Sequence, residues 1–203
     1  MVKVRDFIYP KHNEEIEREL KENGITEVYS YGRVSLGKVN VIGKGKTGII
    51  ALLDHNKVIK IRRSDSPKED MEIEARIQSL AYPVAPRVYH FGKNFIVMEY
   101  IKGVNLDEKR IDLNIILNLL TKARELEERK IEHKELSRPY KNVMISDEGK
   151  VYIIDYDSAS IKEKPLNVTS ILSWLRLNDL ASQYKKTRRL DEIVETLKSR
   201  ILV

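Results

Sequence analysis

The sequence predicts an α+β fold, in which an antiparallel sheet with one inserted helix precedes a mainly helical half. Two observations indicate this order. Apolar and polar residues alternate in several short runs over the first hundred residues, as they do in strands. Over most of the remainder, apolar residues recur every three to four positions, as they do on one face of a helix. We therefore expect two halves, residues 1–101 and 102–203, joined by a short segment near residues 101–104.

The first half is expected to begin with a helix over residues 13–23, capped by Asn13 and ended by Gly24. The hydrophobic period then changes to two. This predicts strands over residues 28–31, 34–42, 47–53, 57–62, 87–91 and 94–100. A second helix is expected over about residues 66–80, because Pro67 suits the first turn of a helix.

The second half is expected to begin with a long amphipathic helix. Asp112 precedes the first apolar residues and predicts the cap, and the periodic pattern continues to about Arg129. The apolar stripe of this helix comprises Ile115, Ile116, Leu119, Leu120, Ala123 and Leu126. A stripe of this width requires a packing partner elsewhere in the chain.

The rest of the second half combines one hairpin with two helices. A loop over residues 133–141 leads to two short strands, residues 142–145 and 151–154, around an Asp-Glu-Gly turn. Helices are expected over about residues 168–185 and 190–201. The helical part of the chain would thus carry one small hairpin. Residues at the ends of such strands often belong to binding or catalytic sites.

The charge and the cysteine content of the chain limit the kinds of partner and of catalytic group that it can use. The 203 residues include 37 Lys and Arg and 31 Asp and Glu, a net charge of +6 that is too modest to identify a partner. The absence of cysteine excludes disulfides, thiolate nucleophiles and Cys-ligated metal centres. The first residues lack the apolar stretch of a signal peptide, and no run reaches the length of a membrane span. We therefore expect a cytoplasmic protein.

A glycine-rich segment lies between two expected strands. Gly43, Gly45 and Gly48 would allow backbone N–H groups to approach phosphate oxygens, although a simple hairpin turn has the same composition. The segment also ends like a P-loop, with a Lys and a Thr after Gly45. That motif requires a glycine where this sequence has Asn40, and a helix where β-branched residues follow. The P-loop interpretation is therefore excluded.

Two pairs of polar residues lie within or next to predicted strands, at positions that suit a binding or catalytic site. Lys60 has apolar neighbours on both sides in a half-buried strand, and Glu74 on the next helix is an available counter-charge. A Lys whose stem reaches the surface is the alternative. Asp155 ends an apolar strand, and Asn142 begins the same hairpin. A carboxylate and an amide oxygen on the two limbs suit magnesium, and a turn aspartate is the alternative.

Six segments, read in order, resemble a protein kinase. They are Gly43-x-Gly45-x-x-Gly48-x-x-Ala51, Val58-Ile59-Lys60, Glu74, Phe95-Ile96-Val97-Met98-Glu99-Tyr100, His133-Lys134-Glu135 to Asn142, and Asp155-Tyr156-Asp157. The short C-terminal part is similar to small atypical kinases such as the RIO kinases, the small kinase of the archaeal tRNA-modifying KEOPS assembly and lipopolysaccharide kinases. The chain looks most like an archaeal group of predicted Ser/Thr kinases.

The resemblance covers roughly residues 35–160 and implies a two-lobed protein-kinase-like fold. Its N-terminal lobe would be the antiparallel sheet with one helix, over residues 1–101. Its C-terminal lobe would be reduced and mainly helical, over residues 102–203, and would carry the catalytic loop and the metal site.

ATP and Mg²⁺ are the cofactors that the resemblance implies. The glycine-rich loop would cover the phosphates. Lys60, paired with Glu74, would contact the α- and β-phosphates, and Asn142 and Asp155 would hold magnesium.

The resemblance also implies how the base is bound and which reaction follows. Met98 would border the adenine pocket, and the backbone at Glu99 and Ile101 would form hydrogen bonds with the adenine edge. The reaction would move the γ-phosphoryl group to a Ser or Thr hydroxyl of a protein, including the chain itself.

The catalytic loop departs from the family pattern His-Arg-Asp. His133 would keep its scaffold role, but Glu135 stands where the family has the catalytic Asp, and Asn142 follows seven residues later instead of five. On one reading, the longer side chain and the longer loop compensate each other, and Glu135 is the base. On the other, the chain is a pseudokinase that acts as a nucleotide-binding switch for a partner. Asp157 replaces the glycine of Asp-Phe-Gly and adds a carboxylate near the metal.

A basic cluster lies between the last two expected helices. Lys185, Lys186, Arg188 and Arg189 could contact RNA or an acidic partner, but no aromatic residues interleave to stack on bases. A solvated turn is the alternative. Trp174, in the preceding helix, is expected in the core.

Overall fold

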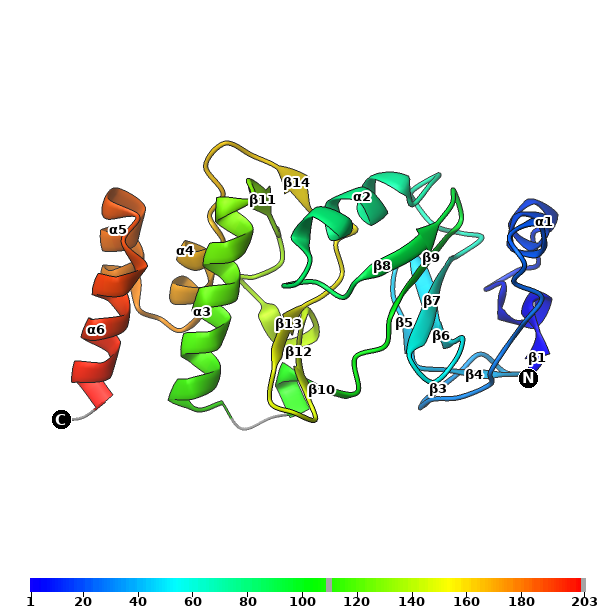
Figure 1. The fold of residues 1–203 in the computed structure, drawn as a ribbon, viewed down its shortest axis with the longest axis horizontal. Helices are drawn as coiled ribbons and strands as arrows, with labels where there is room; N and C mark the ends of the chain where they lie inside the picture. The colour runs from blue at the N-terminus through cyan, green and yellow to red at the C-terminus, as the bar shows by residue number, and fades with distance from the viewer. Residues whose placement is uncertain (109–110, 202–203) are drawn as a thin grey trace. The chain divides into compact units, whose positions relative to one another are not determined.

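The computed structural model describes residues 1–108 and 111–201 and divides the chain into two compact units (Figure 1). Unit 1 comprises Met1–Ser79 and Pro86–Ile101, and unit 2 comprises Leu80–Ala85 and Lys102–Val203. Unit 1 is built mainly on strands and unit 2 mainly on helices, which confirms the predicted α+β class. That the first half binds the nucleotide and the second half carries the catalytic loop and the metal site stays a prediction.

A five-stranded antiparallel sheet forms the centre of unit 1, in the order β5-β6-β7-β9-β8. Its strands are β5 (Gly43–Lys44), β6 (Gly48–Leu52), β7 (Lys57–Arg62), β8 (Val88–Phe91) and β9 (Phe95–Glu99). The central strand β7 pairs with β6 on one side and with β9 on the other. Lys60 therefore lies opposite Ile50 and Ile96, in the middle of the sheet.

The N-terminal segment, residues 2–41, covers one face of this sheet. Its elements are β1 (Val2–Lys3), the 3-10 helix η1 (Val4–Phe7), α1 (Glu14–Glu22), β2 (Glu27–Val28), β3 (Val34–Ser35) and β4 (Asn40–Val41). Phe7 and Ile16 join Ile59 and Ile61 of β7 in one apolar cluster, because alternate residues of a strand share a face. As predicted, Asn13 caps α1, and its Oδ1 accepts the N–H of the third residue along at 3.0 Å.

Helix α2 (Glu72–Ala81) lies on the other face of the sheet. Met71 and Ala75 pack there with Val58 and Ile96. Lys60 alternates in phase with Val58 and therefore belongs to the same face. Because both faces are covered, residues 58–61 are all buried. The prediction of a half-buried strand around Lys60 is wrong for this reason.

Three other predicted elements of unit 1 have clearly different bounds. Of the predicted strand 28–31, only Val28 lies in a strand, β2. The run 34–42 forms a short hairpin of β3 and β4 instead of one strand, because Gly37 adopts φ +93° in the turn. Helix α2 begins at Glu72 instead of near Pro67. The Oδ1 atom of Asp70 accepts the N–H of Glu72 at 3.1 Å and so satisfies a donor that the first turn leaves unpaired.

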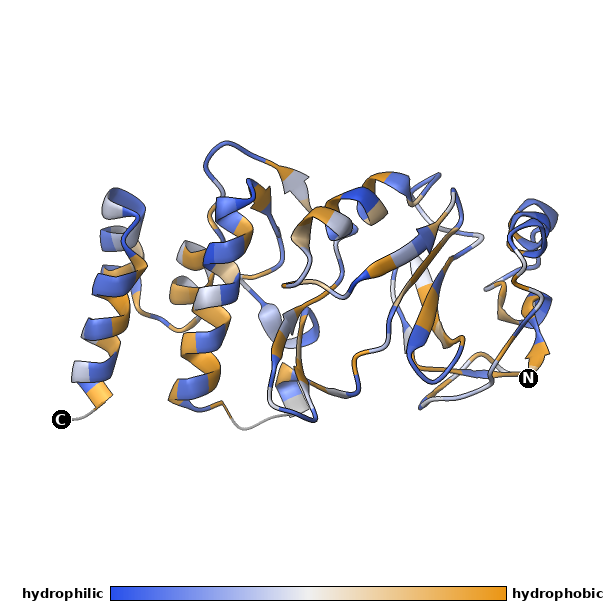
Figure 2. Cartoon of the chain, viewed as in Figure 1, coloured by the Kyte–Doolittle hydropathy of each residue, from blue (hydrophilic) through white to orange (hydrophobic). Residues whose placement is uncertain are grey.

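Helix α3 (Leu113–Glu128) and a three-stranded sheet form the core of unit 2. The sheet has the order β10-β12-β13, with strands β10 (Gly103–Asn105), β12 (Val143–Ser146) and β13 (Val151–Ile153). As predicted, Asp112 caps α3, and its Oδ1 accepts the N–H of Ile115 at 2.8 Å. Figure 2 shows the apolar stripe along this helix. Its buried apolar residues are Ile115, Leu119, Leu120, Ala123 and Leu126.

Shorter elements and three helices complete unit 2. They are η2 (Leu106–Glu108), β11 (Ile131–Glu132), η3 (Pro139–Lys141), β14 (Ser160–Ile161), α4 (Asn167–Trp174), α5 (Asn178–Thr187) and α6 (Leu190–Ile201). The predicted helix 168–185 is broken between α4 and α5, because Arg176 adopts φ +60°. Trp174, predicted in the core, is half-buried and packs edge-on against Tyr140, with ring centroids 5.5 Å apart. Among the described residues, no helix is both long and apolar enough to span a membrane.

Candidate active site

The first group of predicted site residues lies in unit 1, around Lys60. The Nζ atom of Lys60 in β7 is 2.5 Å from Oε1 of Glu74 in α2, and each residue is only 6% exposed. A single charge at such a depth would be strongly destabilising, and the opposite charge offsets that penalty. The structure thus brings the two residues together, and their role toward a nucleotide stays a prediction.

The three predicted glycines lie in the β5–β6 hairpin, whose turn is closed by the N–H of Gly45 donating to the oxygen of Gly48 at 2.9 Å. Gly48 is sterically required, because a Cβ there would lie 2.9 Å from the oxygen of Ile61 and 3.0 Å from Cγ of Lys60. At Gly43 and Gly45, a Cβ would meet no described atom closer than 3.7 Å. Packing therefore explains one glycine of the three.

The residues predicted to border adenine lie at the end of β9. Met98 is 9% exposed, and its sulfur accepts a hydrogen bond from Nε2 of Gln78 at 3.3 Å. The N–H of Glu99 donates to the oxygen of Arg87 at 2.8 Å and is therefore engaged within the sheet. At Glu99 an adenine would have to use the carbonyl oxygen. Ile101, 9% exposed, is the last residue of unit 1.

The second group lies in unit 2 and consists of three carboxylates. Glu135 comes from the loop after β11, and Asp155 and Asp157 come from the segment after β13. One oxygen of each lies within 4.8 Å of one oxygen of the other two. Magnesium–oxygen distances are about 2 Å, so ligands on opposite sides of the ion are about 4 Å apart. The donor type of this acidic cluster therefore suits magnesium, and the 4.8 Å limit on its spacing is close to the largest separation that one ion allows.

Asp155 belongs to the acidic cluster and has an uncommon backbone conformation. It adopts φ +65°, a left-handed conformation that disfavours residues with a side chain by about 1–2 kcal/mol. Asn142 lies across the hairpin, where its carbonyl accepts the N–H of Ile154 at 2.8 Å. The register thus sets the two predicted metal ligands at the same end of the hairpin, and Asn142 is 9% exposed.

His133 connects the loop that carries Glu135 to the segment after β13. Its Nε2 is 2.8 Å from the oxygen of Ile154, and its ring packs edge-on against Tyr156, with centroids 5.2 Å apart. Its backbone N–H donates to Oδ1 of Asn167 at 2.9 Å, and its Nδ1 lies 3.4 Å from the nitrogen of Glu135. The imidazole therefore holds two parts of the site by contacts on both of its ring nitrogens.

Asn167 was not predicted from the sequence. It is fully buried; its Oδ1 accepts the N–H of His133, and its Nδ2 donates to the oxygen of Ile131 at 2.7 Å. These partners are 34 and 36 residues away in the chain. An Asn at the start of a helix gives no sequence signal for such contacts, because it is indistinguishable from a capping residue.

The surroundings of Glu135 change its acidity. Loss of solvent raises the pKa of Glu135, and the negative charges of Asp155 and Asp157 raise it further. The imidazole of His133 acts in the opposite direction. A carboxylate with a raised pKa is a stronger base, and a divalent cation would relieve the repulsion within the cluster.

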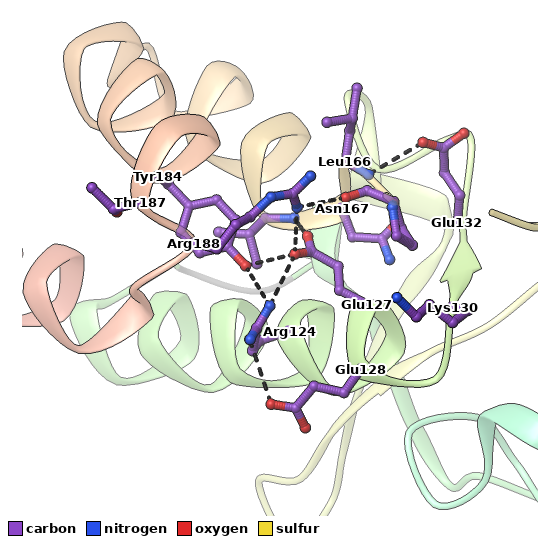
Figure 3. A network of polar contacts seen from close by, with 12 residues as sticks. Arg124, Glu127, Glu128, Lys130, Glu132, Leu166, Asn167, Tyr184, Thr187 and Arg188 are labelled. Atoms are coloured by element: carbon purple, nitrogen blue, oxygen red, sulfur yellow. Dashed lines mark hydrogen bonds and ion pairs between the residues drawn. The ribbon is translucent and has the colours of Figure 1, made fainter. Parts of the chain in front are cut away.

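Part of the predicted basic cluster is engaged inside unit 2. The Nη1 atom of Arg188 donates to Oε1 of Glu127 at 3.1 Å and to the oxygen of Pro165 at 2.8 Å. Glu127, 4% exposed, also accepts from the Tyr184 hydroxyl at 2.5 Å and from the N–H of Val168 at 2.8 Å (Figure 3). Arg188 therefore compensates a buried carboxylate.

The remaining members of the basic cluster lie at the surface. Arg189 pairs with Glu192 at 3.2 Å, and Lys185 and Lys186 are exposed. A contact with RNA stays a prediction, and the surface residues Lys185, Lys186 and Arg189 are the ones positioned to make it.

Comparisons with known proteins bear on the family and the fold of the chain. The model of the RIO domain matches residues 52–172. The probable serine/threonine-protein kinase mkcF of Dictyostelium discoideum is 26% identical over 144 residues, which are 62% of this chain and 21% of that protein. A co-crystal structure of WbdD and the kinase inhibitor LY294002 has a TM-score of 0.50 and 24% identity, over 66% of this chain and 36% of that chain.

These findings establish a protein-kinase-like fold and place the chain in the protein kinase superfamily. Within that superfamily the chain belongs to the RIO-domain family, since the family model covers more than half of its residues. The match begins at residue 52, so the N-terminal segment and the glycine-rich loop lie outside it. The chain spans only about a fifth of the length of the Dictyostelium relative.

Proposed function

We propose that the chain is an ATP- and magnesium-dependent phosphotransferase that moves the γ-phosphoryl group of ATP to a Ser or Thr hydroxyl, on a protein or on its own chain. The observation that carries the proposal is the acidic cluster of Glu135, Asp155 and Asp157. Three carboxylates at this spacing repel one another, and a bound divalent cation compensates that repulsion. Membership in a kinase family supports ATP as the donor.

Unit 1 would bind the phosphates. Lys60 contacts the α- and β-phosphates, and Glu74 keeps its ammonium group in place. The space around Gly43 and Gly45 supports a close approach of the loop backbone to phosphate oxygens, because packing does not account for either glycine.

The adenine base would be bound at the end of β9. Met98 borders the base, the carbonyl of Glu99 accepts from its exocyclic amine, and the N–H of Ile101 donates to a ring nitrogen. The engagement of the Glu99 N–H within the sheet supports this division of acceptor and donor between the two residues.

Asp155 and Asn142 would hold magnesium, and Asp157 is close enough to Asp155 to add an oxygen. When bound, the ion supplies charge neutralisation of the β- and γ-phosphates. The hydrogen bond between His133 and the oxygen of Ile154 keeps the segment that carries Asp155 in place.

Glu135 would act as the base toward the acceptor hydroxyl. The hydroxyl oxygen forms a bond to the γ-phosphorus while its proton passes to the Glu135 carboxylate. The bond between the γ-phosphorus and the β,γ-bridging oxygen breaks, and its electron pair leaves with ADP. Loss of solvent, the largest cause of the raised pKa of Glu135, supports this role, since a base is most effective when its pKa approaches the working pH.

The test incubates the purified protein with Mg²⁺ and γ-labelled ATP, alone and with a generic protein substrate. Wild type should transfer label, and Lys60→Met and Asp155→Asn should abolish transfer. Glu135→Gln should lower turnover by more than about tenfold without changing nucleotide affinity. Lys57→Met in the same strand and Asp147→Asn in the same hairpin are the matched controls and should behave as wild type.

Three results would contradict the proposal or one of its parts. A Glu135→Gln variant as fast as wild type would refute the assigned base. Loss of transfer in Lys57→Met as large as in Lys60→Met would refute a specific role of Lys60. Thermal stabilisation by nucleotide without transfer, at several temperatures, would identify the alternative, a nucleotide-binding switch for a partner.

A further inference from the structure

We propose that Arg63 is a positioning residue that fixes the glycine-rich loop, together with Tyr9 of the N-terminal segment. The inference rests on the proposed function, because it assigns this loop to nucleotide phosphates. Arg63 follows the last residue of β7, three positions after Lys60. Tyr9, like the glycine-rich loop, lies outside residues 52–172, which match the RIO domain.

The guanidinium group of Arg63 uses donors in two directions. Its Nε and Nη2 donate to the two carboxylate oxygens of Asp65, each at 2.8 Å, and its Nη1 donates to the oxygen of Gly45 at 3.0 Å. A bidentate contact with a carboxylate fixes the plane of a guanidinium group. Asp65 therefore sets the direction in which Arg63 reaches the loop. The backbone N–H of Arg63 also donates to the oxygen of Thr47 at 2.9 Å.

Tyr9 contacts both the guanidinium group of Arg63 and the side chain of Lys44. Its ring centroid lies 5.0 Å from Cζ of Arg63 and 5.1 Å from Nζ of Lys44, which precedes Gly45 in the loop. Cation–π contacts at partly exposed sites contribute about 0.5–1 kcal/mol each. The carbonyl of Tyr9 accepts the N–H of Ser64 at 2.8 Å, so the backbone that carries the ring is tied to the residue after Arg63.

The glycine-rich loop gains from external contacts, although its own turn is closed by the hydrogen bond from the N–H of Gly45 to the oxygen of Gly48. Gly43 and Gly45 contribute no side chains, and glycine has access to more backbone conformations than any other residue. Nucleotide affinity decreases in proportion to the fraction of molecules whose loop is not in the binding conformation. By holding the carbonyls of Gly45 and Thr47, Arg63 raises the fraction that is ready to bind phosphates.

The test compares the binding of Mg-ATP and of adenosine to wild type and to Arg63→Met by calorimetry. Affinity for Mg-ATP should fall about tenfold, as expected when one charge-assisted hydrogen bond is lost. Affinity for adenosine should stay within about twofold, since the loop would contact phosphates only. Arg63→Lys should not restore binding, because one ammonium group cannot reproduce the fork geometry. The matched control is Arg18→Ala, at an exposed position of α1.

Variants of Tyr9 examine the ring separately. Tyr9→Phe keeps the aromatic face and should bind Mg-ATP as wild type does, whereas Tyr9→Leu should bind it more weakly. Amide hydrogen exchange of residues 44–48 in the nucleotide-free protein gives a second readout. Exchange there should be faster in Arg63→Met and in Tyr9→Leu, and unchanged in Tyr9→Phe.

Equal losses of Mg-ATP and adenosine affinity, or unchanged exchange in Arg63→Met, would overturn the positioning role. These results differ from failure of the proposed function. If wild type binds Mg-ATP but transfers no label, the proposed function fails and the affinity comparison still decides the role of Arg63. If wild type binds no Mg-ATP, both the proposed use of ATP and the proposed role of Arg63 in nucleotide binding are refuted.

Discussion

Asp155 is the residue at which backbone conformation and chemistry coincide. Its left-handed φ of +65° would suit glycine better than aspartate. Arg176 shows the same conformation, φ +60°, at an exposed break between two helices where no site residue lies nearby in the chain. We therefore expect the Asp155 position to need its carboxylate, and the Arg176 side chain to be incidental to its turn.

Glycine substitutions should separate these two cases. Asp155→Gly and Arg176→Gly should each keep or raise the free energy of unfolding, by up to about 1 kcal/mol, because both relieve left-handed backbone strain. In addition, Asp155→Gly removes a charge from the acidic cluster. Only Asp155→Gly should lose label transfer. Urea unfolding and the transfer assay measure the two effects on the same preparations.

Label transfer by Asp155→Gly at the wild-type rate would show that the Asp155 carboxylate is not needed. A strongly destabilised Arg176→Gly would show that the arginine side chain, and not the turn alone, supports the junction of α4 and α5.

The sequence identifies some residues of the candidate site and not others. Lys60 stands out as a charged group within an apolar strand, and Asp155 as one at the end of an apolar run; the order of motifs suggested a role for each. Arg63 and Asn167 do not stand out. Arg63 contacts the oxygen of Gly45, and Asn167 contacts the backbone of Ile131 and His133. These contacts exist only once distant segments have folded together.

At the scale of elements, local sequence decides some boundaries and not others. Strand β7 and helix α6 have the predicted bounds, because a clear hydrophobic period and flanking polar residues mark them. The break between α4 and α5 is invisible in the sequence, because it depends on left-handed backbone at Arg176, a residue that rarely adopts it. The late start of α2 depends on one side-chain cap from Asp70, which competes with the signal of Pro67.

Three helices of unit 2 meet at one buried carboxylate. Glu127 of α3 accepts from the backbone of α4 at Val168, from Tyr184 of α5, and from Arg188 at the C-terminal cap of α5 (Figure 3). Burial and the neighbouring carboxylate raise the pKa of Tyr184 to about 12, so its hydroxyl stays a donor at neutral pH. The junction is therefore held by polar contacts as well as by apolar packing.

Replacement of Arg188 should destabilise this junction. Arg188→Met is expected to lower the free energy of unfolding by about 2–3 kcal/mol, because Glu127 stays buried with less compensation for its charge. Lys185→Met, at an exposed position of the same basic cluster, is the matched control and should change it by less than about 0.5 kcal/mol. Urea denaturation measures both.

Wild-type stability of Arg188→Met would show that the remaining donors satisfy Glu127. The result also decides how the RNA hypothesis is tested, since a structural Arg188 cannot be replaced without altering the fold. Lys185→Ala with Lys186→Ala is then the appropriate variant for measuring RNA affinity and its dependence on salt.

At the scale of the whole molecule, nucleotide binding should be visible as stability. Trp174 is the single tryptophan of the chain and lies in unit 2, so its fluorescence follows the unit that carries the acidic cluster. Mg-ATP at a hundred times its dissociation constant should stabilise the folded state by about 2.7 kcal/mol and raise the melting temperature. Removal of magnesium by EDTA should reduce that shift.

Asp155→Asn should abolish the part of the shift that requires magnesium, and Asp147→Asn should retain it. A shift that is insensitive to EDTA in wild type would contradict a magnesium site in the acidic cluster. A shift with no label transfer would again favour the nucleotide-binding switch.

Burial of both faces of the unit 1 sheet constrains how the chain can fold during synthesis. Phe7 and Ile16 leave the ribosome early, but Phe95 and Val97, which complete their cluster, follow about eighty residues later. At ordinary rates of translation that interval is about 4–16 s. Throughout it, the emerging chain carries an apolar surface that it cannot yet cover. Any shortened chain that stops before β9 keeps that surface permanently, and poor solubility of such fragments is the consequence.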